Sequence, residues 1–178
     1  AIKIIVIMQL QTLRYERADT PAGQVATITF DEQGSPVNTM CLQWQHDMAA
    51  VTQQVVNDRD AVQGLIQASP KTTVCAGADL KGVMRMTAAD APRVYAEIER
   101  IKACFRTLET LGIPVVSCIN GSALGGGMEV ALIGHHRIAV DDAKLQLGLP
   151  ELTLGLIPGA TGITKFTRLL GLMGAQPY

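Results

Sequence analysis

The fold is decided by the stretch Ile113-Pro-Val-Val-Ser-Cys-Ile-Asn-Gly-Ser-Ala-Leu-Gly-Gly-Gly-Met-Glu129. Its first half is almost entirely apolar, which is typical of a strand that is covered on both faces of its sheet. The apolar run ends in a glycine-rich turn, and a helical pattern begins inside the glycines and places Glu129 one turn into the helix. Glycines let the backbone approach a ligand closely, and the first amides of a helix favour negative charge. The stretch therefore predicts a turn that can hold an oxyanion beside a carboxylate, as carbonyl chemistry requires.

Strand and helix signals alternate on both sides of this stretch. On its amino-terminal side we expect strands at 13–16 and 25–30 joined by a turn at 19–23, and another strand at 64–69. Between these strands we expect a helix with apolar residues at helical spacing, namely Trp44, Met48, Val51 and Val55. A long helix should start at Thr87 and carry the apolar residues Val94, Ile98, Ile101, Phe105 and Leu108. On its carboxy-terminal side we expect a short helix near 128–132, a strand at 137–140 and a helix at 163–170. This alternation predicts an α/β fold, and no linker divides residues 1–178 into two domains.

The composition excludes several classes of function. The 178 residues are 48% hydrophobic, 17% charged and only 4% aromatic, with a formal net charge of -1. This is typical of a globular domain with a real core, and it lacks the basic face of a nucleic-acid-binding protein. The expected partner is therefore a small molecule.

The cysteines and the amino terminus indicate the cellular compartment in which we expect the protein. The cysteines Cys41, Cys75, Cys104 and Cys118 contain no C-x-x-C pair, so we expect free thiols in the reducing cytoplasm. Residues 1–8 are apolar but too short to span a bilayer, and they lack a signal-peptide cleavage region. They are interpreted as a strand or an added extension, and no membrane span is predicted.

Two glutamates, Glu129 and Glu151, lie in apolar stretches with few charges. Such surroundings favour the neutral form of a carboxyl group, and two carboxyls in different settings can act as an acid and a base. Addition of water to a double bond needs both roles. Taken singly, Glu129 is compatible with an ordinary helix-face residue and Glu151 with an ordinary loop carboxylate.

Two backbone amides are candidate oxyanion donors. One belongs to Gly126 at the expected helix start, and the other to Ala76 in the loop Cys75-Ala-Gly-Ala-Asp79. If both point at the carbonyl oxygen of a thioester, they stabilise its enolate.

Taken together, these motifs resemble the crotonase (enoyl-CoA hydratase/isomerase) superfamily. The resemblance covers residues 13–172, and it is closest to the hydratase portion of bacterial multifunctional fatty-acid β-oxidation proteins. It rests on Cys75-Ala-Gly-Ala-Asp79, on residues 114–129, on Leu147-Gly-Leu-Pro-Glu-Leu-Thr-Leu-Gly-Leu-Ile-Pro-Gly-Ala-Thr-Gly162 and on the early loop Gly34-Ser-Pro-Val-Asn-Thr39.

The resemblance implies a spiral of ββα repeats, usually assembled as trimers, and a lyase of the hydro-lyase type that acts on an acyl-CoA. It implies syn hydration of a trans-2-enoyl-CoA to a 3-hydroxyacyl-CoA, with Glu129 activating the water and Glu151 donating the proton at the α carbon. The oxyanion hole falls on Ala76 and Gly126, and no metal or cofactor is needed besides the coenzyme A of the substrate. The implied substrate contacts are Ala76, Gly77, Ala78, Asp79, Gly125, Gly126, Pro150 and Gly159. Since family members continue with carboxy-terminal helices, we expect a single crotonase-like domain truncated at its carboxy terminus.

Several alternatives remain open at this point. A 3-enoyl-CoA isomerase needs only one carboxylate to shuttle its proton, and a crotonase-like module can also bind acyl-CoA or a partner without catalysis. A nucleotide-binding domain would use Asp141 after the glycines, but these do not follow G-x-G-x-x-G. A metal site of His135, His136, Asp141 and Asp142 is disfavoured, because adjacent histidines on a helix end do not easily face one ion.

Overall fold

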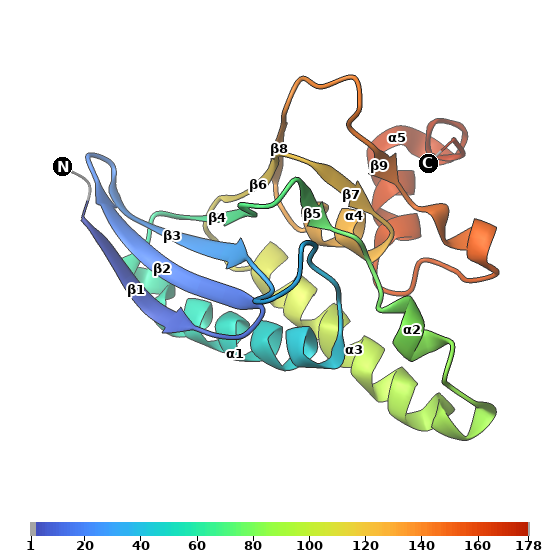
Figure 1. Ribbon diagram of the computed structural model, residues 1–178. Coiled ribbons are helices and arrows are strands. Elements are labelled where there is room, and N and C mark those ends of the chain that lie inside the picture. The colour runs from blue at the N-terminus through green and yellow to red at the C-terminus, as the bar shows by residue number, and fades with distance from the viewer. Residues whose placement is uncertain (1–2, 178) are drawn as a thin grey trace.

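Two β-sheets form the frame of the molecule in the computed structural model, which describes residues 3–177 (Figure 1). The larger sheet has the strand order β1 (Ile4–Gln9), β2 (Leu13–Thr20), β3 (Gly23–Phe30), β4 (Gly64–Ala68), β6 (Val115–Ile119), β8 (His136–Ala139). Its first three strands are antiparallel and the others run parallel to β3. The smaller, parallel sheet has the order β5 (Thr73–Cys75), β7 (Ser122–Leu124), β9 (Leu147–Gly148).

The helices lie between these strands in the sequence, except for the last two, which follow β9. They are α1 (Leu42–Asp58), η1 (Arg59–Ala61), α2 (Leu80–Val83), η2 (Ala88–Asp90), α3 (Ala91–Glu109), α4 (Gly126–Ala131), η3 (Pro150–Leu154) and α5 (Gly162–Ala175). Within residues 3–177, no helix is both long and apolar enough to cross a membrane.

A ββα unit repeats along the chain. After α1, each repeat gives one strand to the larger sheet, the next strand to the smaller sheet, and then one or more helices: β4, β5 and α2–α3, then β6, β7 and α4, then β8, β9 and η3–α5. This arrangement confirms the expected α/β spiral. It also places the loops after β5, β7 and β9 side by side, because the three strands are parallel and adjacent.

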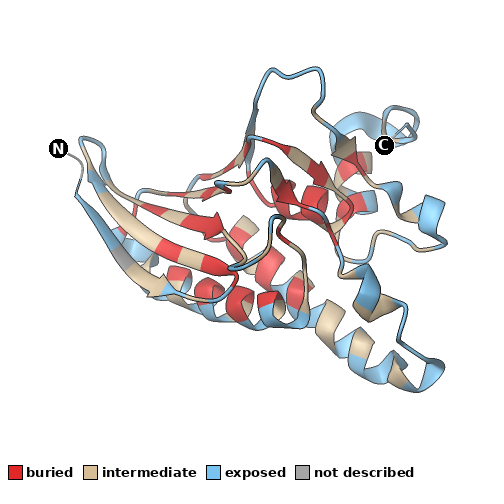
Figure 2. Ribbon diagram, viewed as in Figure 1, coloured by how far each residue is buried: buried red, intermediate tan, exposed pale blue. Residues whose placement is uncertain are grey.

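Two apolar cores hold the sheets to the helices, as the buried segments in Figure 2 show. The first lies between the larger sheet and helices α1 and α3, where the rings of Trp44 and Phe105 meet edge to face with centroids 6.4 Å apart. Met48, Val51 and Val55 are fully buried beside them, so the helical spacing expected for α1 is confirmed. The second core packs the smaller sheet against α4 and α5 through residues such as Ala123, Met128 and Phe166.

The glycine-rich stretch differs from the expectation in one respect. We expected the helix to follow the apolar strand directly, but the strand β7 stands between β6 and α4. The backbone of β5 passes so close that a Cβ on Gly121 would collide with the carbonyl of Thr72, and one on Gly127 with the carbonyl of Cys75. These two glycines therefore serve close packing of the chain on itself.

The amino-terminal segment forms a strand. Residues 4–9 make β1 and pair with β2, whereas residues 1 and 2 lie outside the described residues. The free thiols expected at the cysteines are found at all four positions, with Cys75 and Cys104 buried. Burial raises the pKa of the Cys75 thiol to about 12, which favours an uncharged, structural cysteine.

The buried side chain of Asn38 connects the two sheets. Its Nδ2 lies within 3.0 Å of the carbonyls of Phe30 and Val74 and the hydroxyl of Ser69, and its Oδ1 accepts the amide of Glu32. These partners lie near the ends of β3 and β4 and in β5, so Asn38 fixes where the β5 loop begins.

Replacing Asn38 by leucine should lower the free energy of unfolding by about 3 kcal/mol, because two buried carbonyls would lose a donor and each such loss costs about 1–3 kcal/mol. Urea denaturation measures the change. Asn57→Leu, on the exposed face of α1, is the matched control and should have little effect. Equal unfolding energies in the two variants would contradict this role of Asn38.

Candidate active site

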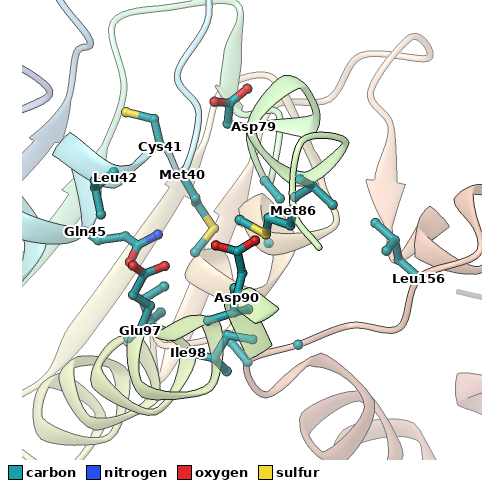
Figure 3. A pocket seen from close by; sticks show the side chains of 18 of the residues that line it. Met40, Cys41, Leu42, Gln45, Asp79, Met86, Asp90, Glu97, Ile98 and Leu156 are labelled. Atoms are coloured by element: carbon teal, nitrogen blue, oxygen red, sulfur yellow. The ribbon is translucent and has the colours of Figure 1, made fainter. Parts of the chain in front are cut away.

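A cavity of about 480 Å³ opens beside the ends of β5 and β7. Its polar end is lined by Ala78, Gly126, Glu151, Gly159 and Ala160, and the side chain of Met40 also lies against Gly126 there. The rest of its wall is mostly apolar, with Val83, Met86, Val94, Ile98 and Ile101. Figure 3 shows Met40, Met86 and Ile98 around this space. The cavity thus joins a polar, glycine-rich end to a region that suits an aliphatic chain.

The carboxylate of Glu129 is held in a fixed position behind this polar end. Its Oε1 accepts the backbone amides of Ala160, Thr161 and Gly162 at 2.9, 2.7 and 2.7 Å, and the residue is only 3% exposed. Glu129 itself does not line the cavity, but Ala160, whose amide it accepts, does. With Oε1 occupied, Oε2 is the oxygen that can take a further partner.

Glu151 lies on the cavity wall itself, at the start of η3. A Cβ on Gly125 would stand only 2.8 Å from its Oε1, so the glycine leaves room for this carboxyl. Its Oε2 is buried without a hydrogen-bond partner among the described residues. Burial raises the pKa of the Glu151 carboxyl above its ordinary value, and the nearby charge of Glu129 acts in the same direction.

The raised pKa of Glu151 predicts a pH dependence of stability. Since the folded state binds this proton more tightly than the unfolded state, the contribution of Glu151 is fully present below the ordinary glutamate pKa and is lost as the pH rises through the raised value. Glu151→Gln removes this loss, so the variant should gain stability relative to wild type across that window. Urea denaturation from pH 4 to pH 8 measures it, with Glu99→Gln on the exposed face of α3 as the control. A pH-independent difference would show that the pKa is not raised.

The oxyanion donors are placed differently from the expectation in one respect. The amide of Ala76 donates to the carbonyl of Asn38 at 2.9 Å and is not free to bind a ligand. Ala76 directly follows β5, and the next residue, Gly77, has a positive φ of 87°. Ala76 is therefore corrected as a donor, and the first amide beyond the turn belongs to Ala78.

The amides of Ala78 and Gly126 are both unpaired at the cavity among the described residues. Both residues line it, and neither amide donates to another group within residues 3–177. The two loops are in close contact, because a Cβ on Gly77 would lie 3.3 Å from the amide nitrogen of Gly126. Two separate loops therefore present their free N–H groups at the same polar end.

The other expected substrate contacts divide into two groups. Asp79 and Gly159 line the cavity, as Ala78 and Gly126 do. Gly77, Gly125 and Pro150 do not line it, and the first two instead allow the close approaches described above.

The sequence did not predict that the amino-terminal half of α3 forms part of the cavity wall. Val94 and Ile98 belong to the apolar stripe predicted for α3, and they are half-buried and line the cavity, whereas Phe105 and Leu108 lie in the core. Helical spacing identifies one face of a helix, but it does not show that the amino-terminal half of that face lacks a partner.

One histidine of the disfavoured metal site, His135, has a structural role. His135 Nδ1 accepts the amide of Val115 at 3.1 Å, and Nε2 lies 2.8 Å from the carbonyl of Glu109, which assigns the proton to Nε2. Both ring nitrogens are thus engaged, and the residue ties α3 to β6.

Known proteins share the sequence pattern and the fold of this chain. The sequence model of the family described as enoyl-CoA hydratase/isomerase matches residues 20–177. The chain is 36% identical over 152 residues to a fatty acid oxidation complex subunit alpha of Shewanella amazonensis, and 37% identical over 153 residues to that of Shewanella oneidensis. Each match covers 85% of this chain but only 21% of the relative, so the chain spans about a fifth of the length of these curated relatives.

Solved structures show the same fold. An enoyl-CoA hydratase from Bacillus anthracis matches with a TM-score of 0.76 and 30% identity, over 91% of this chain and 59% of that one. A Geobacillus kaustophilus structure described as an enoyl-CoA hydratase matches with a TM-score of 0.82 over 99% of this chain and 64% of that one. Its 21% identity supports the fold alone. The expected similarity to crotonases and to multifunctional β-oxidation proteins is confirmed.

Proposed function

The chain belongs to the enoyl-CoA hydratase/isomerase family, and we propose that it adds water to the double bond of a trans-2-enoyl-CoA to give a 3-hydroxyacyl-CoA. The observation that carries this proposal is the presence of two carboxyls of different character beside two unpaired amides. Glu151, whose pKa is raised, lines the cavity together with Ala78 and Gly126, and Glu129 is fixed directly behind its wall.

The first step of the proposed reaction forms an enolate. The thioester oxygen accepts the amides of Ala78 and Gly126, and a water held by Oε2 of Glu129 attacks the β carbon. A proton of the water passes to Glu129, the C–O bond forms, and the electron pair of the double bond moves through the α carbon onto the thioester oxygen.

The second step returns this electron pair to carbon. Glu151, whose raised pKa favours the protonated form, donates its proton to the α carbon, and the thioester carbonyl is restored. Glu129 ends with one proton more and Glu151 with one fewer, and exchange with solvent resets both. The reaction moves protons and a water only, so it needs no electron acceptor.

The direct test is the loss of the conjugated-thioester absorbance of crotonyl-CoA. The assay is run on the purified protein, and a 3-enoyl-CoA is offered in parallel. Hydration of the 2-enoyl substrate is the expected result. Conversion of the 3-enoyl substrate without hydration would establish an isomerase instead, and binding without turnover would establish a non-catalytic module.

A role in fatty-acid β-oxidation is part of the same proposal, because the matched relatives are named subunits of a fatty acid oxidation complex. The trimer expected from the family resemblance stays a prediction, which light scattering on the purified protein tests.

A further inference from the structure

One lysine outside the cavity contacts both structures that fix Glu129. Lys165, in the first turns of α5, has a side chain that is only 11% exposed. Its Nζ donates to the carbonyl of Leu132 at 2.9 Å and to Glu109 Oε1 at 2.7 Å. Its backbone amide donates to the carbonyl of Thr161 at 3.0 Å, which is the ordinary main-chain bond of the first turn of α5 and places the lysine one turn after residues 160–162.

These contacts reach the two sides of Glu129. Leu132 caps the carboxy-terminal end of α4, the helix that carries Glu129. Thr161 lies in the turn 160–162, whose three amides hold Glu129 Oε1. The turn leads directly into α5, which packs against α4 through apolar residues such as Met128 and Phe166. The side chain of Lys165 adds a polar connection between these two helices, one turn from the amides that hold Glu129.

The partner of Lys165 is itself fixed in place. Glu109, at the end of α3, also pairs with Arg106 at 3.2 Å. Burial tends to raise the pKa of Glu109, but the Lys165 ammonium and the Arg106 guanidinium outweigh burial and hold that pKa below its ordinary value. The ion pair thus stays formed around neutral pH and connects the long helix α3 to α5.

We propose that Lys165 is a positioning residue, which holds α4 and the turn 160–162 at the separation that keeps Glu129 Oε1 on its three amides and directs Oε2 toward the substrate. The effect of Lys165 on catalysis rests on the proposed function. Its effect on the position of the Glu129 carboxylate does not.

The structural part is tested by amide hydrogen exchange on the full chain. In Lys165→Met, exchange at Ala160, Thr161 and Gly162 should speed up by about tenfold or more, because their shared acceptor is no longer held. Exchange in the later turns of α5 should not change, and Lys165→Arg should restore protection. Lys102→Met is the control, because Lys102 pairs with Glu99 on the surface of α3 and with no other carboxylate in the described part of the chain.

Two results would overturn the proposal. Unchanged exchange at 160–162 in Lys165→Met would show that the turn does not depend on the lysine. Faster exchange along the whole of α5 would show that Lys165 only docks this helix.

The catalytic part is tested by steady-state kinetics with crotonyl-CoA. Lys165→Met should lower kcat by about 10- to 100-fold with little change in KM, because misplacing a reacting group affects the chemical step more than binding. Equal losses in Lys165→Met and Lys165→Arg would contradict positioning. If wild type itself does not hydrate crotonyl-CoA, the proposed function fails, and the exchange result still decides the structural part.

Discussion

Replacing Glu151 by glutamine is expected to slow the hydration of crotonyl-CoA by about 100- to 10,000-fold, the range by which a positioned acid or base contributes to catalysis. Glutamine keeps the size of the side chain but cannot donate the carboxylic proton to the α carbon. Glu129→Gln should have a loss of the same order, because its amide oxygen can still accept the amides of the turn 160–162 but no base remains for the water.

The matched control for both variants is Glu99→Gln, an exposed glutamate on α3 that should leave kcat unchanged. Steady-state rates from the loss of enoyl-thioester absorbance measure all three. The two-carboxyl account would be wrong if either active-site variant kept wild-type kcat. A loss confined to one of them would favour a reaction in which a single carboxylate moves the proton.

Removing the backbone amide of Ala78 is expected to lower the rate by about 100- to 1000-fold, as the loss of one oxyanion donor does elsewhere. The N–H is replaced by an ester oxygen through incorporation of lactic acid at position 78, which keeps the side chain. The same exchange at Ala76 removes the hydrogen bond to Asn38, so it should cost about 1 kcal/mol of stability without the rate loss.

The two esters separate the donor that the structure supports from the one expected from sequence. Rates and unfolding energies are measured on both proteins. A large rate loss at 76 with none at 78 would show that the loop after β5 turns differently when substrate binds.

The strands and helices were largely predictable because their cores are regular. Trp44, Met48 and Val51 repeat at helical spacing, and Thr87 with Asp90 forms the capping box that starts η2 and α3. The smaller sheet was harder to predict, since β5, β7 and β9 have only two or three residues each. Segments this short show no periodicity and are stabilised by contacts distant in sequence.

The candidate site was predictable in its residue types and less so in its geometry. Glycines and isolated glutamates in apolar stretches identified Gly126, Glu129 and Glu151. The choice of Ala76 was wrong because amide direction depends on which residue carries the positive φ, and Gly77 moves the free N–H to Ala78. The anchoring of Glu129 by the turn 160–162 joins segments 31 to 33 residues apart and has no local sequence signal.

The most direct test of the account is mass spectrometry of the product formed from crotonyl-CoA in water labelled with both ¹⁸O and deuterium. The expected product is 3-hydroxybutyryl-CoA with one ¹⁸O at the β carbon and one deuterium at the α carbon. In Glu129→Gln and in Glu151→Gln, both labels should enter the product more slowly than in wild type. Deuterium at the α or γ carbon without ¹⁸O would contradict the account, because the site would then move protons but add no water.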